Sequence, residues 1–173
     1  MTEDTVRASD LDPNFKFDVA KTYEGKSVLW CVQCGMCTSN CPYSDILDVK
    51  PHQVIKRVLL GMKSQAISCK SIWLCSTCFM CAERCPQGVE VARVMFALKN
   101  MAAKEKGVPE GYKQFGQQVM QNGRAMKITS LREKERERLG LPRIPHTDSE
   151  AIKDMLKKIK LDEILNKKGD EHQ

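Results

Sequence analysis

Eight of the nine cysteines in the chain fall into two motifs of identical spacing. The first motif is CVQCGMCTSNCP at residues 31–42, and the second is CSTCFMCAERCP at residues 75–86. Both follow the pattern C-x-x-C-x-x-C-x-x-x-C-P. Sulfur donors packed this closely are suited to soft metal ions and metal clusters. The repeated motif is therefore where the sequence concentrates its chemistry.

Three kinds of chemistry could use thiols at this spacing. Disulfides are disfavoured, because cysteines so close in one motif leave little room for bridge geometry. Zinc is the structural alternative, but a zinc site typically takes its ligands from two separated C-x-x-C pairs. Three cysteines at intervals of three, followed by a fourth before a proline, form the bacterial-type [4Fe–4S] pattern. The sequence therefore predicts two [4Fe–4S] clusters.

In this pattern the fourth cysteine of each motif ligates the other cluster. We therefore expect one cluster to be held by Cys31, Cys34, Cys37 and Cys85, and the other by Cys75, Cys78, Cys81 and Cys41. The alternative, in which each motif closes on its own cluster, is made difficult by the short reach to the fourth cysteine. Crossed ligation would tie the motifs together, so that cluster assembly also stabilises the fold. Because every predicted ligand is a cysteine, no iron is left open for a substrate, and we expect electron transfer with no catalytic residue.

Several residues close to the cysteines have predicted supporting roles. Gly35 should let backbone amides approach the cluster sulfurs, and such hydrogen bonds tune the reduction potential. Met36 and Met80 are expected to pack around the clusters. Trp30 and Trp73, which closely precede the motifs, are predicted to keep water off them.

The remaining candidate ligands show no metal-binding pattern. Cys69 lies outside both motifs and is expected to be a buried small hydrophobe, with a redox or reserve-ligand role as the alternative. The histidines, His52, His146 and His172, lack ligand spacing and are assigned surface or structural roles. The chain contains no G-x-G-x-x-G, H-E-x-x-H or G-x-S-x-G motif, which argues against nucleotide-cofactor, metalloprotease and serine-hydrolase chemistry.

Composition limits the classes of function further. The formal net charge of +6 comes from 28 Lys and Arg against 22 Asp and Glu. Both signs are interleaved along the chain, which favours a solvated surface over a nucleic-acid site. No apolar run approaches the roughly 20 residues of a membrane span, and the polar start does not resemble a signal peptide. We therefore expect a soluble, cytoplasmic protein, where thiols serve metal or redox chemistry.

The periodicity predicts a mainly α-helical fold around the two motifs. Helices are expected from Pro51 to before Gly61, after Val91 to near Gly107, and over residues 110–122. A short charged helix should end before Pro142, and a last helix should start at a capping box of Thr147 and Glu150. Residues 14–30 fit either a strand or a short helix. The predicted organisation is an N-terminal extension (residues 1–24), a helical two-cluster ferredoxin domain (25–108), and a C-terminal helical arm with a frayed tail (109–173).

The motifs, the intervening helix and the stretch IWLCSTCFMCAERCPQGVEV together resemble the helical ferredoxin family. Within that family, the length, the RCPQGVEV continuation and the LGLPRIP segment resemble the C subunit of heterodisulfide reductase. The resemblance covers most of residues 25–145. The paired motifs are highly specific for two clusters and less specific for this subunit, because many electron-transfer modules share them.

The resemblance implies partners as well as a function. In that family, the C subunit relays electrons between a flavin-containing A subunit and a catalytic B subunit that cleaves a disulfide, in methanogens the coenzyme M–coenzyme B heterodisulfide. The cysteine-rich C-C-G stretches that mark the B subunit do not occur here, so the chain alone is expected to be non-catalytic. Two alternatives remain at this point. One is a similar relay in a sulfur-oxidising complex or in a lactate, glycolate or formate dehydrogenase assembly, and the other is a zinc-stabilised adaptor. The C-terminal arm could dock partner subunits or cover the ferredoxin core.

Overall fold

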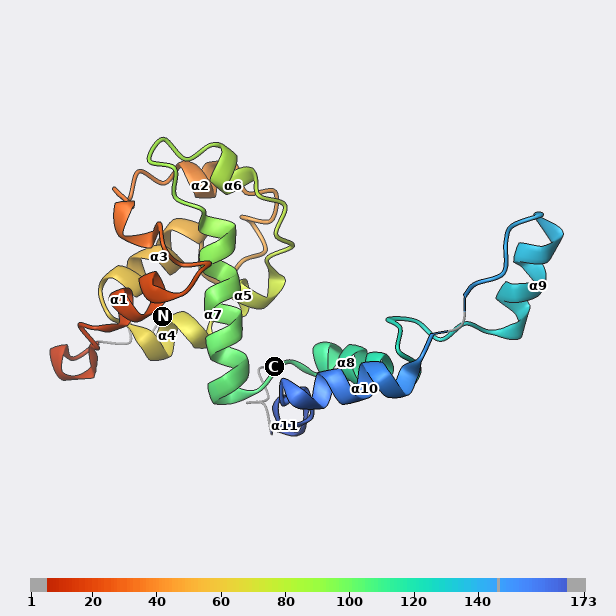
Figure 1. Ribbon diagram of the computed structural model, residues 1–173. Coiled ribbons are helices and arrows are strands. Elements are labelled where there is room, and N and C mark those ends of the chain that lie inside the picture. The colour runs from red at the N-terminus through yellow and green to blue at the C-terminus, as the bar shows by residue number, and fades with distance from the viewer. Residues whose placement is uncertain (1–5, 146, 168–173) are drawn as a thin grey trace. The chain divides into compact units, whose positions relative to one another are not determined.

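The computed structural model describes residues 6–145 and 147–167. The regular secondary structure of these residues consists of helices joined by loops, with no strand (Figure 1). This confirms the prediction of a mainly α fold. The chain divides into two compact units, with the boundary between Glu105 and Lys106. No helix in the described part of the chain combines the length and the apolar character that a membrane span requires.

The described part of the first unit contains short and medium-length helical elements. These are η1 (Ala8–Asp10), α1 (Phe15–Lys21), η2 (Val28–Trp30), α2 (Met36–Ser39), α3 (Pro51–Leu59), α4 (Lys63–Ser68), α5 (Lys70–Leu74), α6 (Met80–Glu83) and α7 (Val91–Lys106). The helices predicted after each motif are α3, with Pro51 at its start, and α7. Both predictions are confirmed.

A single hydrophobic core holds these elements together. Its fully buried side chains come from α1, η2, α3, α5 and α7, and include Phe15, Val28, Ile55, Ile72 and Leu98. α1 settles the alternatives for residues 14–30 in favour of a short helix, and its Phe15 and Val19 are buried in this core. Part of the predicted N-terminal extension is thus packed structure.

The two cysteine motifs fold in the same way. Each contains a one-turn helix, α2 or α6, that begins after a left-handed residue and carries the third cysteine. The backbone hydrogen bonds match: Thr38 N–H to Gly35 O and Ala82 N–H to Phe79 O are both 2.9 Å. The backbone N–H groups of the fourth cysteines, Cys41 and Cys85, also donate to equivalent carbonyls. α2 and α6 lie side by side at one edge of the unit (Figure 1).

Two buried serines link each motif to the segment beyond the other. Ser27 Oγ accepts the backbone N–H of Glu90 at 2.9 Å, and Ser71 Oγ accepts that of Val49 at 2.9 Å. Ser27 and Ser71 each stand four residues before the first cysteine of a motif, in SVLWC and SIWLC. The internal repeat therefore extends upstream of the cysteines, and its hydrogen bonds cross between the two halves.

The second unit contains α8 (Glu110–Asn122), α9 (Ser130–Arg138), α10 (Ser149–Lys158) and α11 (Leu161–Asn166). The predicted helices over residues 110–122 and before Pro142 are confirmed, and Gly123 ends α8 with a φ of 62°. The predicted capping box is wrong. Asp148, not Thr147, caps α10, and its carboxylate accepts the backbone N–H groups of Glu150 and Ala151.

Packing within the second unit depends on small and large residues that fit together. α8 contacts both α10 and α11. Gly116 of α8 is buried, and a Cβ at this position would lie 2.7 Å from a methyl carbon of Leu165. α9, by contrast, buries none of its side chains.

Candidate iron–sulfur site

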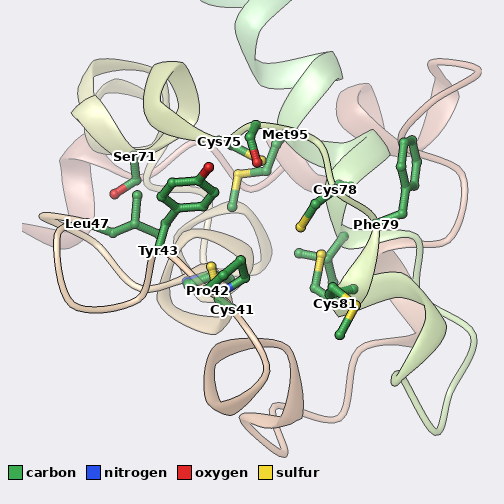
Figure 2. Close-up of a pocket in the computed structure, with 15 residues that line it drawn as sticks. Cys41, Pro42, Tyr43, Leu47, Ser71, Cys75, Cys78, Phe79, Cys81 and Met95 are labelled. Carbon is green, nitrogen blue, oxygen red and sulfur yellow. The ribbon is translucent and has the colours of Figure 1, made fainter.

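Four of the predicted ligands line one cavity, here called the Cys41 cavity. Its cysteines are Cys41, Cys75, Cys78 and Cys81. Figure 2 shows three of them on the second motif and Cys41 reaching the same space from the first motif. Most of the other lining side chains are apolar, among them Leu47 and Met95, and the empty space, part of it open to solvent, is ≈ 450 Å³.

The other four predicted ligands line a second cavity, here called the Cys85 cavity. Its cysteines are Cys31, Cys34, Cys37 and Cys85. The lining is completed by residues that include Met36, His52 and Val89, and the empty space is ≈ 320 Å³. Each cavity thus brings together three cysteines of one motif and the fourth cysteine of the other.

The two cavities are neighbours. Val91, at the start of α7, lines both. The third cysteines of the motifs are also close enough to affect each other: after burial, the charge of Cys81 is the largest cause that raises the pKa of Cys37. Adjacent redox groups at these places would form a two-step path for an electron.

Burial and crowding make free thiolates unfavourable here. Burial first, and then neighbouring cysteine charges, raises the pKa of Cys37 to about 11. The same causes in the same order, with Cys75 as the main neighbour, raise the pKa of Cys81 to about 11. A metal that neutralises the sulfurs removes this penalty, because coordinating thiols are deprotonated by the metal itself.

The loops that carry the first two cysteines share a left-handed backbone. Gln33 and Gly35 have φ values of 58° and 80°, and their counterparts Thr77 and Phe79 have 54° and 62°. No protein atom lies within 4 Å of where a Cβ on Gly35 would stand, so the expected approach of its backbone to a cluster stays a prediction. Gly35 suits this position because of its positive φ. Phe79 adopts the same conformation without that advantage, which places strain at the site.

Several polar contacts surround the cysteine sulfurs and carbonyls. Cys31 Sγ accepts the backbone N–H of Gln33 at 3.4 Å, and Cys85 Sγ accepts that of Val89 at 3.2 Å. Beside the Cys41 cavity, Lys99 donates to the Cys75 carbonyl at 2.9 Å. Burial lowers the pKa of Lys99, and the charge of Cys75 opposes that shift.

These residues fit [4Fe–4S] clusters. Each cavity presents four sulfur donors and mostly apolar walls, and in the Cys85 cavity two backbone N–H groups already bond to cysteine sulfurs. Within the described residues, no three His, Cys, Asp or Glu side chains are close enough together to hold a single metal ion. The four thiols of each set are instead spread around a cavity.

Not all of the predicted supporting residues lie where they were expected. Met80 and Met36 line the Cys41 and Cys85 cavities, respectively. Trp30 lines neither cavity and is 60% exposed, which contradicts its predicted role as a water shield, and Trp73 packs against the core instead. Cys69 is buried, as predicted, and its thiol donates to the Ala66 carbonyl at 3.2 Å.

Sequence reasoning also missed functional neighbours. His52 was expected to have a surface or structural role, yet it lines the Cys85 cavity. Its distance in sequence from the cysteines hid this. His146 and His172 lie outside the described residues. Ser27 and Ser71 could have been found, because they occupy equivalent positions in the extended repeat.

Comparison with known proteins agrees with this geometry. Residues 30–90 match the family described as the 4Fe-4S dicluster domain. That stretch contains both motifs and the segment between them. The fold and the site therefore define a helical protein of the [4Fe–4S] dicluster class.

Relatives resemble the chain along nearly its whole length. It is 29% identical to the iron-sulfur C subunit of the CoB–CoM heterodisulfide reductase of Methanopyrus kandleri, over 91% of this chain and 88% of the relative. It is 32% identical to the C subunit of the H2:CoB-CoM heterodisulfide,ferredoxin reductase of Methanothermobacter thermautotrophicus, over 91% and 86%. It is 32% identical to the C subunit of the ferredoxin/F420H2-dependent CoB-CoM heterodisulfide reductase of Methanosarcina acetivorans, over 84% of this chain and 93% of the relative.

The chain belongs to the family of heterodisulfide reductase C subunits. It is an iron–sulfur electron-transfer subunit of an oxidoreductase complex that contains several different chains.

Proposed function

We propose that the protein holds two [4Fe–4S] clusters and relays electrons between a flavin-containing A subunit and a disulfide-reducing B subunit. The observation that carries this proposal is the lining of the two cavities, each by three cysteines of one motif and one of the other. The proposed ligands are Cys31, Cys34, Cys37 and Cys85 for one cluster, and Cys75, Cys78, Cys81 and Cys41 for the other.

When bound, such clusters supply one-electron redox chemistry at potentials that the protein tunes. This chain's residues hold the clusters, keep them adjacent across Val91, and surround them with largely apolar walls. Four cysteines per cavity fill every ligand position of a cubane. We therefore propose that the chain has no catalytic residue of its own and that disulfide cleavage takes place on its partner.

The substrate assignment rests on the relatives. Those compared above are named as subunits of enzymes that act on the CoB–CoM heterodisulfide. We propose the same terminal reaction for the complex that contains this chain, with the electrons arriving from a flavin. The proposed site needs its cysteines as thiolates rather than disulfides, so we place the protein in the reducing cytoplasm.

Anaerobic purification of the native chain tests both the cofactor and the partners. We expect close to eight iron atoms and eight acid-labile sulfides per chain, together with a copurifying flavoprotein and a second cysteine-rich protein with C-C-G stretches. Zinc with two or fewer irons would overturn the cofactor assignment. If the chain held eight irons but copurified with a sulfur-oxidising complex or with a lactate, glycolate or formate dehydrogenase, its electron-relay role would stand and the complex assigned to it would change.

A further inference from the structure

His52 is the one imidazole among the described residues that line either cysteine cavity. It belongs to α3, whereas the four cysteines of the Cys85 cavity come from the two motifs. The His52 side chain is half-buried. It lines the cavity from a position eleven residues beyond Cys41, the last cysteine of the first motif. A polar ring in this lining is a candidate to interact with whatever the cysteines hold.

Thr38 fixes the orientation of this ring. Thr38 Oγ1 accepts the backbone N–H of His52 at 3.2 Å and lies 2.6 Å from His52 Nδ1. A hydroxyl that accepts one hydrogen bond still has its own proton to donate, and Nδ1 is within reach. Donation to Nδ1 makes this nitrogen the acceptor and leaves the proton of the neutral ring on Nε2. His52 then carries an N–H donor on the nitrogen that Thr38 does not engage.

The other half of the repeat has no such pair. Thr38 directly follows Cys37, whereas Ala82 directly follows the equivalent Cys81. In the Cys41 cavity, the lining residues from α7 are Val91, Ala92 and Met95, which offer no side-chain N–H. The Thr38–His52 pair is therefore a feature of the Cys85 cavity that the Cys41 cavity does not share.

We propose that His52, oriented by Thr38, donates a hydrogen bond to the cluster group of the Cys85 cavity and raises the reduction potential of that cluster alone. The reduced cluster carries one more negative charge than the oxidised cluster, so a donor stabilises the reduced form more. His52 acts here as a positioning and tuning residue and is not a ligand. This inference rests on the crossed ligation proposed above.

The test is a redox titration of the anaerobically reconstituted full-length chain, followed by electron paramagnetic resonance. His52→Leu should make reduction of one cluster about tenfold less favourable, which for a one-electron couple is about 59 mV. His52→Gln keeps a donor and should shift the potential less. Thr38→Val leaves the ring but removes its partner and should give an intermediate shift in the same direction. Lys56→Ala, at an exposed position on α3, is the matched control and should change neither potential.

Cysteine variants identify which cluster responds. Cys85→Ser and Cys41→Ser should each alter a different resonance signal, and the cluster shifted in the His52 variants must be the one altered by Cys85→Ser. A shift in the other cluster, or in both equally, would overturn the proposal, and so would unchanged potentials at full iron content. If the His52→Leu variant loses iron, the potentials of the His52→Gln and Thr38→Val variants test the proposal instead. Because these potentials are measured without partners, a different partner complex would revise the function and leave this inference standing, whereas bound zinc would overturn both.

Discussion

At the scale of single residues, the nine cysteines divide by their surroundings. Eight line the two cavities, while Cys69 is 5% exposed within the hydrophobic core and lines neither. Burial raises the pKa of the Cys69 thiol and keeps it protonated, so its chemistry is that of a small apolar side chain.

We therefore expect opposite results from two cysteine-to-alanine changes. Cys69→Ala should leave the iron content of the chain unchanged and lower its stability by about 1 kcal/mol, through lost packing and one weak hydrogen bond. Cys37→Ala should remove one ligand and cost the chain about half of its iron. Iron and sulfide analysis, together with thermal unfolding, measures both effects. If the Cys69→Ala variant stayed fully soluble but lost iron, the result would support the alternative that Cys69 is a reserve ligand.

The ligands were predictable from sequence because their spacing is local. A C-x-x-C-x-x-C run constrains a few adjacent dihedral angles, and this information survives without knowledge of the fold. His52 carries no such signal. Its place in the cavity depends on how α3 packs against α2, which no short pattern encodes. The positive φ of Phe79 was equally hidden, because a bulky residue does not indicate a left-handed backbone.

At the scale of elements, the long amphipathic helices were predictable and the short ones were not. α3, α7 and α8 each run for nine or more residues with a clear apolar stripe or a clear stop signal. α2, α4, α5 and α6 are four to six residues long. Helices so short are unstable alone, so their presence reflects tertiary contacts and the cysteine loops more than intrinsic propensity.

The crossed serine hydrogen bonds should matter for the stability of the first unit. Ser27→Ala and Ser71→Ala each leave a backbone N–H without its acceptor, and we expect each to lower the free energy of unfolding by about 1–3 kcal/mol. The exposed Ser64→Ala on α4 is the matched control and should change it by less than about 0.5 kcal/mol. Chemical unfolding of the cluster-loaded chain measures this. Equal effects of all three changes would argue against the crossed links.

Asp48 adds a pH-dependent link between the segment that follows the first motif and α5. Its carboxylate accepts the backbone N–H groups of Lys70 at 3.0 Å and Ser71 at 2.8 Å, and the Ser71 hydroxyl as well. Burial raises the pKa of Asp48, but these hydrogen bonds outweigh it and hold the pKa below the ordinary value of 3.8. A depressed pKa means that this stabilisation is fully present above pH 3.8 and is lost as the pH falls through the folded-state value.

We expect Asp48→Asn to destabilise the chain by about 1 kcal/mol at pH 7, because hydrogen bonds to a charged acceptor are stronger than hydrogen bonds to a neutral amide oxygen. The difference from the unchanged protein should stay constant between about pH 7 and pH 5, because Asp48 remains charged over that range. Unfolding midpoints in urea at several pH values measure it. A difference that fails to shrink as the pH falls below 3.8 would mean that the pKa of Asp48 is not depressed.

At the scale of the whole molecule, the two units differ in how they are stabilised. All eight predicted ligands and nearly all of the large buried side chains belong to the first unit. The described part of the second unit buries few apolar side chains, chiefly Leu165 and Val108. It also exposes large ones on several helices, including Phe115, Leu131 and Met155. Where such side chains form a contiguous patch, they are typical of surfaces that bind other proteins.

Truncation after Val108 separates the two possible roles of the C-terminal arm. If the arm docks partners, the shortened chain should keep close to eight irons, because its ligands and core are intact, and it should no longer copurify with the flavoprotein and the C-C-G protein. Full-length Leu165→Ala is the companion variant, since it removes the side chain packed on Gly116 and should weaken partner capture while leaving the iron content unchanged. The opposite pattern, with iron lost and partners retained, would assign the arm to protection of the ferredoxin core.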